Sequence, residues 1–179
     1  TIDSATMMNK GFEVIEAFWL FRTPYEKIEI IIHPESIIHS MIQFIDGSIK
    51  AQLSEPTMKI PILFALTYPK RYKLPNMSFD FIKNNQLNFE KVDYDKFKCI
   101  KLAYEAGKSQ GSYTTVLNVA NDISVELFLN NKIKFDKIPI IIDTCLQKHS
   151  NIFKPNLEEI KDTITWTKNY IEGKIIKNV

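Results

Sequence analysis

Cysteine, glycine and long apolar runs are all scarce in this chain of 179 residues. The two cysteines, Cys99 and Cys145, form no C-x-x-C pair, so we expect two buried, reduced thiols in a reducing compartment. The five glycines form no Gly-rich dinucleotide motif, so we expect no cofactor to bind through such a loop. No apolar run approaches the length of a membrane span, and we therefore expect no membrane partner.

An excess of either charge is also absent. The 23 basic and 21 acidic residues leave a net charge of +2, which gives no reason to propose nucleic acid as a partner. What is present is the composition of an ordinary soluble globular protein, with 45% hydrophobic and 25% charged residues. The length is sufficient for one hydrophobic core or two small ones.

The order of hydrophobic patterns predicts an α+β fold, with a small sheet and helices, then a linker, then a C-terminal four-helix bundle. The first part is expected to contain a strand end at Thr1 and Ile2, a helix over 6–21, a largely buried strand over 27–32, strands over 40–44 and 48–53, and a short helix over 58–66. Between the last two strands, Asp46 and Gly47 predict a hairpin with a type I′ turn, which requires positive φ.

The periodicity breaks between residues 69 and 97, where prolines and asparagines interrupt it. We therefore predict three regions: a mixed α/β region over 1–68, a linker over 69–97 and a helical bundle over 98–179. The bundle helices are expected at about 97–108, 114–130, 135–149 and 157–173.

The helix over 6–21 begins with a choice of capping residues. An oxygen of Asp3, Ser4 or Thr6 can accept a hydrogen bond from one of its unpaired backbone N–H groups. Its apolar side chains recur at helical spacing and are expected to face a core; they are Met8, Phe12, Ile15 and Trp19.

Three polar residues on the first turns of this helix share one surface neighbourhood. Asn9 and Lys10 lie four and three residues before Glu13, so the three side chains can touch. The helix dipole and unpaired N–H groups favour an anion there, Lys10 adds a charge for a phosphate, and Ser4 and Asn9 add donors. Glu13 can hold a divalent cation, so a phosphorylated substrate chelated to a metal would suit this surface. The alternative is an ordinary surface pair of Lys10 and Glu13, with Ser4 as an ordinary cap.

Other polar residues carry weaker hypotheses. His33 and His39 are six residues apart with a proline between them, which is a poor spacing for metal ligands. A histidine at the end of a strand usually hydrogen-bonds a backbone group instead. Asn118 and Asn121 are interpreted as caps near a helix start, and His149 is expected to contact carbonyl groups at a helix end.

Several blocks of the sequence are long enough to carry a family resemblance. The first is Ser4-Ala5-Thr6-Met7-Met8-Asn9-Lys10-Gly11 followed by Glu13. Further blocks lie at 33–41, 46–48, 51–53, 56–58, 93–95, 99–103 and 117–121. Together they resemble the 1-deoxy-D-xylulose 5-phosphate reductoisomerase family, whose enzymes depend on NADPH and a divalent metal and belong to the non-mevalonate isoprenoid pathway. The resemblance covers nearly the whole chain and thins out after about Leu129.

The resemblance implies that this chain is the C-terminal part of such an enzyme. Region 1–68 would end the catalytic and dimerisation domain, and region 98–179 would be the C-terminal helical domain. In the family an NADPH-binding Rossmann domain, two acidic metal ligands, a catalytic lysine and a flexible lid lie upstream. NADPH would then be bound mainly outside this segment, and the fragment alone would be inactive. The family also implies a homodimer, in the bacterial cytoplasm or in a plastid stroma.

The same resemblance implies roles for individual residues. The implied substrate contacts are Ser4, Asn9, Lys10, Glu13, His39 and Met58. Lys10 and Glu13 would be the catalytic residues among them, and Glu13 would be one of three carboxylates on a Mg²⁺ or Mn²⁺ ion. Met58 can equally be a methionine that fills a gap in a core.

The implied reaction rearranges 1-deoxy-D-xylulose 5-phosphate and reduces the resulting aldehyde with NADPH, giving 2-C-methyl-D-erythritol 4-phosphate. The rival hypothesis is a non-catalytic module for dimerisation or assembly, because the hairpin over 40–53 offers a sheet that can pair across a two-fold axis. Asn9, Lys10 and Glu13 discriminate between the two, since dimerisation needs none of these polar side chains.

Overall fold

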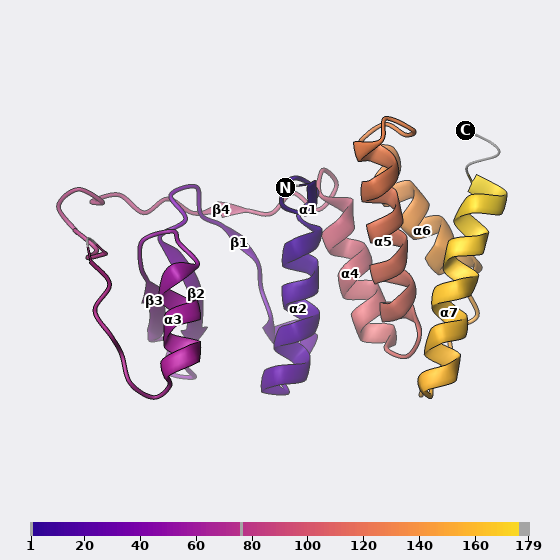
Figure 1. Cartoon of the computed structure of the whole chain (residues 1–179). Coiled ribbons are helices and arrows are strands. Elements are labelled where there is room, and N and C mark those ends of the chain that lie inside the picture. Colours follow the sequence, from indigo (N-terminus) through magenta and orange to yellow (C-terminus); the bar gives the residue numbers. More distant parts are fainter. Residues whose placement is uncertain (1, 76, 176–179) are drawn as a thin grey trace. The chain divides into compact units, whose positions relative to one another are not determined.

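The computed structural model describes residues 2–75 and 77–175, which form two compact units. The first, the helical unit, combines residues 1–30 with residues 93–179. The second, the hairpin unit, comprises residues 31–92. Figure 1 follows the chain through both. The predicted strand end at Thr1 and the end of the predicted bundle, residues 176–179, lie outside the described residues.

The helical unit consists almost entirely of helices. Its elements are α1 (Ile2–Ala5), α2 (Met8–Phe21), the 3₁₀ helix η1 (Tyr25–Lys27), α4 (Lys98–Ser109), α5 (Tyr113–Leu129), α6 (Lys137–Lys148), α7 (Leu157–Tyr170) and the π-helix η2 (Ile171–Ile175). The four predicted bundle helices are confirmed as α4 to α7, with small shifts at their ends. The predicted strand end is wrong at Ile2, which begins α1.

Helix α2 packs against α4, so the first long helix and the C-terminal helices share one core. The buried residues of α2 are Met8, Gly11 and Val14, at a spacing of three. A Cβ atom added at Gly11 would lie 2.5 Å from the Cβ of Ala103 on α4, so the two helix backbones approach very closely here. These compact units therefore differ from the three predicted regions, because residues 1–30 join the bundle.

The predicted inward face of α2 is only partly right. Phe12 and Ile15 are partly buried against the core, whereas Trp19 is 50% exposed. The buried stripe runs through Gly11 and Val14 instead. Glycine has no side chain to contribute to a hydrophobic pattern, so the sequence periodicity places the stripe on a neighbouring face of the helix.

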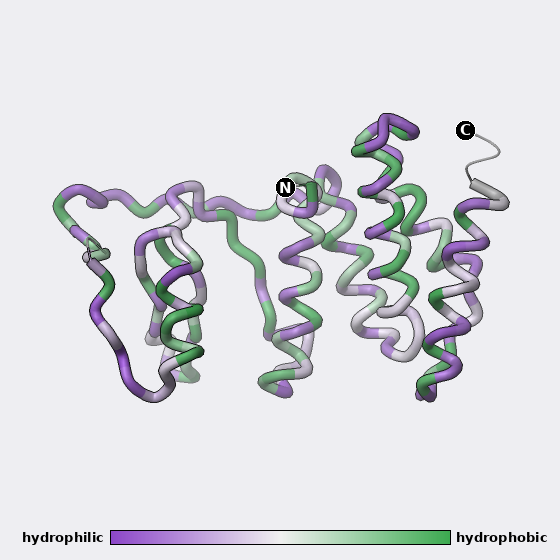
Figure 2. Tube along the Cα trace, in the orientation of Figure 1, coloured by the Kyte–Doolittle hydropathy of each residue, from purple (hydrophilic) through white to green (hydrophobic). Residues whose placement is uncertain are grey.

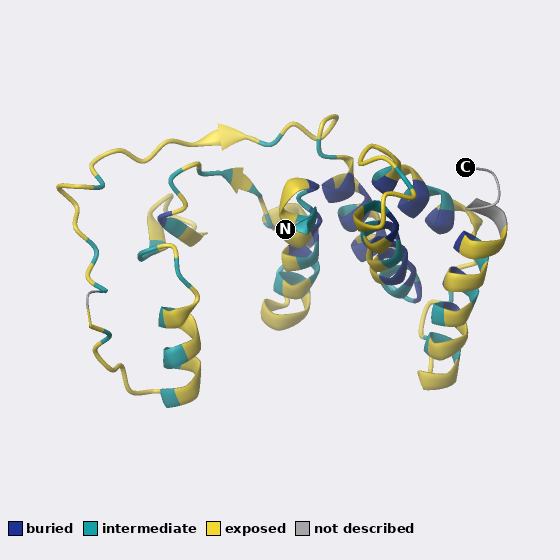
Figure 3. Cartoon of the chain, turned by 45° about the horizontal axis from the view of Figure 1, so that its top comes forward, coloured by how far each residue is buried: buried dark blue, intermediate teal, exposed yellow. Residues whose placement is uncertain are grey.

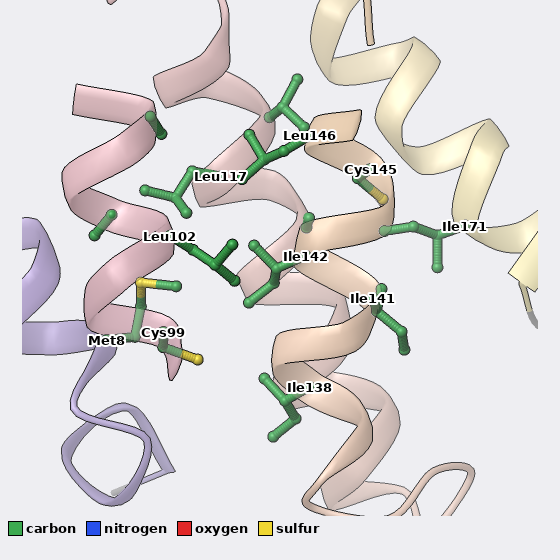
Figure 4. Close-up of a cluster of buried hydrophobic side chains, with 14 of the residues drawn as sticks. Met8, Cys99, Leu102, Leu117, Ile138, Ile141, Ile142, Cys145, Leu146 and Ile171 are labelled. Atoms are coloured by element: carbon green, nitrogen blue, oxygen red, sulfur yellow. The ribbon is translucent and has the colours of Figure 1, made fainter. Parts of the chain in front are cut away.

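The shared core is apolar and contains both thiols. Figure 4 shows Met8 beside Cys99, with Leu117, Ile142 and Cys145 in the same cluster of side chains. Cys99 and Cys145 are free and buried, as predicted. Burial raises the pKa of Cys99 to about 11 and that of Cys145 to about 12, because a thiolate is disfavoured away from water.

The hairpin unit contains two short antiparallel pairs of strands and one helix. Its elements are β1 (Ile31–Ile32) paired with β4 (Glu90–Lys91), β2 (Ile38–Gln43) paired with β3 (Ile49–Leu53), and α3 (Lys59–Thr67). The predicted hairpin and short helix are confirmed, and with them the mostly helical α+β fold. The predicted buried strand over 27–32 is wrong, because only its last two residues are a strand and Ile31 is exposed.

The hairpin turn has a different geometry from the predicted type I′ turn. Of Asp46 and Gly47, only the glycine has a positive φ, at +84°. The Gly47 N–H donates to the Phe44 carbonyl at 2.9 Å, and the Phe44 N–H donates to the Ser48 carbonyl at 2.8 Å. A turn followed by one left-handed glycine closes the hairpin in this way. The Ser48 side chain and N–H both donate to the Asp46 carboxylate and lower its pKa.

The hairpin unit buries little of its apolar surface. Among its described residues, Ile37 alone is buried, and Figure 3 shows the exposed and half-buried residues of β2, β3 and α3. Helix α3 is apolar around most of its circumference, as Figure 2 shows, and no residue of it is buried. Such a helix is normally covered on more than one side. Across the part of the chain that the structure describes, no helix has the length and hydropathy needed to cross a membrane.

Candidate functional site

Four of the predicted site residues, Ser4, Asn9, Lys10 and Glu13, lie on or beside a sharp turn between α1 and α2. We call this turn the α1–α2 corner (residues 2–8). Met7 at this turn has left-handed backbone angles, φ 57° and ψ 18°, and α2 starts at the next residue. The Met8 N–H donates to the Thr6 hydroxyl at 3.3 Å. Thr6 thus satisfies an N–H at the start of α2, as predicted for a cap, although Met7 occupies the capping position. Ser4 lies one turn earlier, where its carbonyl accepts from the Met7 N–H at 3.3 Å.

Asn9, Lys10 and Glu13 meet on the first turns of α2, as their spacing predicts. The Asn9 amide donates to Glu13 Oε1 at 3.1 Å, and the Lys10 ammonium lies 2.6 Å from the same oxygen. The Lys10 and Glu13 side chains are about half exposed, at 49% and 48%. At that exposure an ion pair stabilises the fold by only about 0–1 kcal/mol. The cluster therefore contributes little to folding.

A hollow of about 380 Å³ opens beside this cluster. Its walls come from α2 and α5, both in the helical unit, and the lining residues are Asn9, Phe12, Glu13, Ile15, Glu16, Thr114 and Asn118. The volume lies in the range of about 300–1,000 Å³ that is usual for small-molecule sites. Glu16 and Thr114 are not among the residues for which the sequence predicts a role at a site. The signal for the α5 wall was the spacing of four between Thr114 and Asn118, which places these two polar side chains on one face of the helix.

The donor set around Glu13 suits one ligand position on a hard divalent cation. A carboxylate oxygen is the ligand that Mg²⁺ and Mn²⁺ prefer, and the Asn9 amide supports the Glu13 carboxylate. Within residues 2–75 and 77–175, no group of three or more His, Cys, Asp or Glu side chains has the arrangement of a metal site. The carboxylate of Glu13 can thus supply one oxygen ligand of the kind that such a cation takes.

The two second-tier residues belong to the hairpin unit. His39 lies on β2 and is exposed. Met58 directly precedes α3 and is 69% exposed, so the alternative of a core methionine is wrong in this structure. The approach of His39 and Met58 to a substrate stays a prediction.

His33 contacts residues near both ends of the hairpin unit. Its Nδ1 lies 2.8 Å from the Asn88 carbonyl and 3.0 Å from the Glu35 carboxylate, and its ring stacks on Phe89. The Asn88 side chain also donates to Glu35, which lowers the pKa of that carboxyl. The predicted backbone hydrogen bond of a histidine at a strand end is thus confirmed.

The capping roles expected for Asn118 and Asn121 are wrong, because both residues lie in the interior of α5. Asn121 is fully buried, and its Nδ2 donates to Asp3 Oδ1 at 3.0 Å. His149 contacts a side chain instead of terminal carbonyls. Its Nε2 lies 2.8 Å from the hydroxyl of buried Ser112 at the start of α5. Burial beside Trp166 lowers the pKa of His149.

Comparisons with known proteins bear on this site. A family model described as the DXP reductoisomerase C-terminal domain matches residues 53–170. A second model, the 1-deoxy-D-xylulose 5-phosphate reductoisomerase C-terminal domain, matches residues 1–21, which include the α1–α2 corner and the polar cluster.

Two curated relatives, both called 1-deoxy-D-xylulose 5-phosphate reductoisomerase, illustrate the match. The protein of Chloroherpeton thalassium is 50% identical over 97% of this chain and 45% of its own length. That of Thermoanaerobacter sp. is 52% identical over 99% of this chain and 47% of its own length. The chain thus spans slightly less than half the length of the curated relatives that it matches.

Solved structures agree with the sequence matches. The reductoisomerase of Zymomonas mobilis in complex with NADPH is 46% identical, with a TM-score of 0.87, over 93% of this chain and 44% of that one. A DOX-P reductoisomerase in complex with NADPH, fosmidomycin and magnesium is 40% identical, with a TM-score of 0.91, over 98% of this chain and 45% of that one.

Proposed function

This chain belongs to the 1-deoxy-D-xylulose 5-phosphate reductoisomerase family, and from that premise we propose that it supplies the phosphate contacts and one metal-binding carboxylate of such an enzyme. The reaction would convert 1-deoxy-D-xylulose 5-phosphate into 2-C-methyl-D-erythritol 4-phosphate by rearrangement and reduction. NADPH, bound mainly by regions outside this chain, would supply the hydride. A relative solved with NADPH, fosmidomycin and magnesium supports this proposal.

The observation that carries the proposal is the convergence of Asn9 and Lys10 on Glu13 at the head of α2, beside a hollow. A phosphorylated substrate with a chelated cation carries negative charge on the phosphate and positive charge on the cation. This surface carries the opposite charges, a positive one on Lys10 and a negative one on Glu13. Lys10, Ser4 and Asn9 would bind and orient the phosphate and the substrate backbone at the positive end of the helix. A Mg²⁺ or Mn²⁺ ion held partly by Glu13 would act as a Lewis acid on the substrate oxygens.

The phosphate role is tested by Lys10→Ala in a full-length reductoisomerase that carries this segment. A hydrogen bond to a charged group contributes about 1.5–3 kcal/mol, so affinity for the substrate should fall about ten- to a hundredfold. Affinity for an analogue without the phosphate should hardly change. Equal losses for both ligands would refute the assignment.

A matched control exists on α7. Lys161 forms a similar exposed pair with Glu158, three residues earlier, at 2.9 Å. Lys161→Ala should change neither affinity. If Lys10 is only a surface partner of Glu13, Lys10→Ala should behave like Lys161→Ala and affect folding stability by less than about 1 kcal/mol.

We also propose that the chain of 179 residues has no reductoisomerase activity by itself. It offers one carboxylate to a metal and no dinucleotide motif, so two parts of the proposed reaction would have to come from elsewhere. Oxidation of NADPH that depends on substrate, measured with the purified chain, would overturn this expectation.

Dimerisation is a second and compatible role. The turn end of the hairpin exposes several apolar side chains, namely Ile42, Phe44, Ile45 and Ile49. We propose that the full-length protein is a homodimer, located in the bacterial cytoplasm or a plastid stroma. A pure assembly module would bind no phosphorylated sugar, so the Lys10→Ala experiment also separates the two roles.

A further inference from the structure

We infer that Asn121 is a positioning residue for the proposed phosphate site, because from the interior of α5 it holds the α1–α2 corner that carries Ser4 and leads into Lys10. The inference rests on the proposed function of Ser4 and Lys10. It assigns to the C-terminal bundle a part in the site that goes beyond packing.

The contact that carries the inference links residues far apart in sequence. Asn121 is 0% exposed, and its Nδ2 donates to Asp3 Oδ1 at 3.0 Å. The amide group must point its NH₂ toward the carboxylate, because the opposite orientation would set two acceptors against each other. Asp3 directly precedes Ser4 on α1, a helix of four residues that has no buried residue of its own. The bond from α5 thus adds a polar contact to a short helix whose Ile2 is only partly buried against the core.

The carbonyl oxygen of the Asn121 side chain indicates that the stability of the core is not the reason for an asparagine at this position. Among the described residues, its Oδ1 is one of the buried side-chain atoms that have no hydrogen-bond partner. Leaving a buried acceptor unpaired lowers stability, and an apolar side chain of similar volume would avoid that loss. What a leucine could not provide is the bond to Asp3.

Like charges near the corner give the amide a further part. Asp122 follows Asn121 on α5, and both its burial and the nearby Asp3 carboxylate raise its pKa. Asp122 and Asp3 repel each other when both are ionised, so this pair alone would push the corner away from α5. The Asn121 amide opposes that repulsion. On the other side, Thr6 is 5% exposed, and its hydroxyl accepts a hydrogen bond from the Met8 N–H.

The first arm of the test measures the corner itself in the chain of 179 residues. The variant is Asn121→Leu, and the matched control is Ser124→Ala. Ser124 is also fully buried on α5, but its hydroxyl donates to the Ala120 carbonyl of its own helix at 2.6 Å. Hydrogen exchange of the Thr6 and Met8 amides should become about tenfold faster or more in Asn121→Leu, since a bond to a charged group is lost. It should not change in Ser124→Ala.

The second arm measures the consequence in a full-length reductoisomerase that carries this segment. Asn121→Leu should raise KM for the phosphorylated substrate about tenfold, the size of effect seen when a supporting partner of a ligand is removed. Neither kcat nor affinity for the analogue without phosphate should change by more than about twofold. Ser124→Ala should leave all three unchanged. A merely structural role would affect kcat, both ligands and the free energy of unfolding together.

The outcomes separate this inference from the proposed function. If Lys10→Ala gives a phosphate-selective loss and Asn121→Leu does not, the inference is wrong and the phosphate site stands. If exchange of the corner amides is unchanged in Asn121→Leu, the inference is also wrong. If Lys10→Ala itself shows no phosphate-selective loss, the phosphate site is wrong and the inference falls with it.

Discussion

Replacing Gly11 with alanine tests how closely α2 is held against the bundle. In an open helix, alanine in place of glycine stabilises the fold by about 1 kcal/mol. In α2 the new Cβ would lie 2.5 Å from the Cβ of Ala103 and 3.6 Å from the Met8 sulfur. Carbon atoms prefer separations of about 3.5–4.0 Å, so α2 and α4 would have to move apart by about 1 Å.

The two effects have opposite signs, and the steric one is larger. Overpacking a core costs about 1–3 kcal/mol, whereas the gain in helix propensity is about 1 kcal/mol. We therefore expect Gly11→Ala to lower the free energy of unfolding by about 1 kcal/mol. Gly173→Ala is the matched control, since a Cβ at Gly173 meets no atom within 4 Å. It should be neutral or slightly stabilising.

Urea unfolding followed by tryptophan fluorescence is the assay. Trp19 and Trp166 are the two tryptophans and both belong to the helical unit, so the signal reports on the unit in question. In a double-mutant cycle, Ala103→Gly should restore space for the new Cβ, with a coupling of about 1 kcal/mol or more. If Gly11→Ala stabilised the chain as Gly173→Ala does, or the cycle showed no coupling, the close approach of α2 and α4 would be refuted.

Three further predictions follow from other parts of the structure. Glu13→Gln in a full-length reductoisomerase should abolish activity and weaken Mg²⁺ binding, because it removes the negative charge that a hard cation requires. It should lower the free energy of unfolding by less than about 1 kcal/mol, because the side chain is half exposed. Unchanged metal affinity in a titration would exclude Glu13 as a ligand. The folded-state pKa values of Cys99 and Cys145 are raised to about 11 and about 12, so the folded chain keeps protons that the unfolded chain releases. The contribution of the two thiols to stability should therefore be constant below about pH 8 and fall as the pH rises further. The urea midpoint should fall as the pH rises above about 8, and it should fall less in a variant with both cysteines replaced by alanine. Asn156→Ala should cost about 1 kcal/mol in the same assay, since Asn156 and Glu159 form the capping box of α7, and an unchanged midpoint would contradict that contribution.

Most of the secondary structure could be predicted from the sequence because it is set locally. The bundle helices follow from apolar residues at helical spacing, and the hairpin over β2 and β3 from a turn signal between two strands. The polar cluster of Asn9, Lys10 and Glu13 is equally local, since residues three and four apart on a helix must be neighbours. These features need no knowledge of the rest of the fold.

The errors share a physical cause, which is contact between distant segments. Gly11 faces Ala103 only because α2 packs on α4, and a residue without a side chain gives no apolar signal. Asn121 looks like a cap in sequence, yet its partner is Asp3, which lies 118 residues earlier in the chain. His149 likewise hydrogen-bonds the side chain of Ser112 at the start of α5 instead of carbonyl groups at its own helix end. Periodicity and capping rules describe one segment at a time and cannot specify such pairs.

The division of the helical unit into two separate stretches of chain has a consequence for how this protein can vary. Residues 31–92 are in effect an insertion, and its two ends are brought together by the pairing of Ile31 with Lys91 and of Ile32 with Glu90. For the helical unit the insertion is a closed loop, and doubling the length of a flexible loop costs only about 0.6 kcal/mol. Segments within 33–89 can therefore be lengthened, shortened or exchanged between relatives with little change in the stability of the helical core, as long as β1 and β4 still pair.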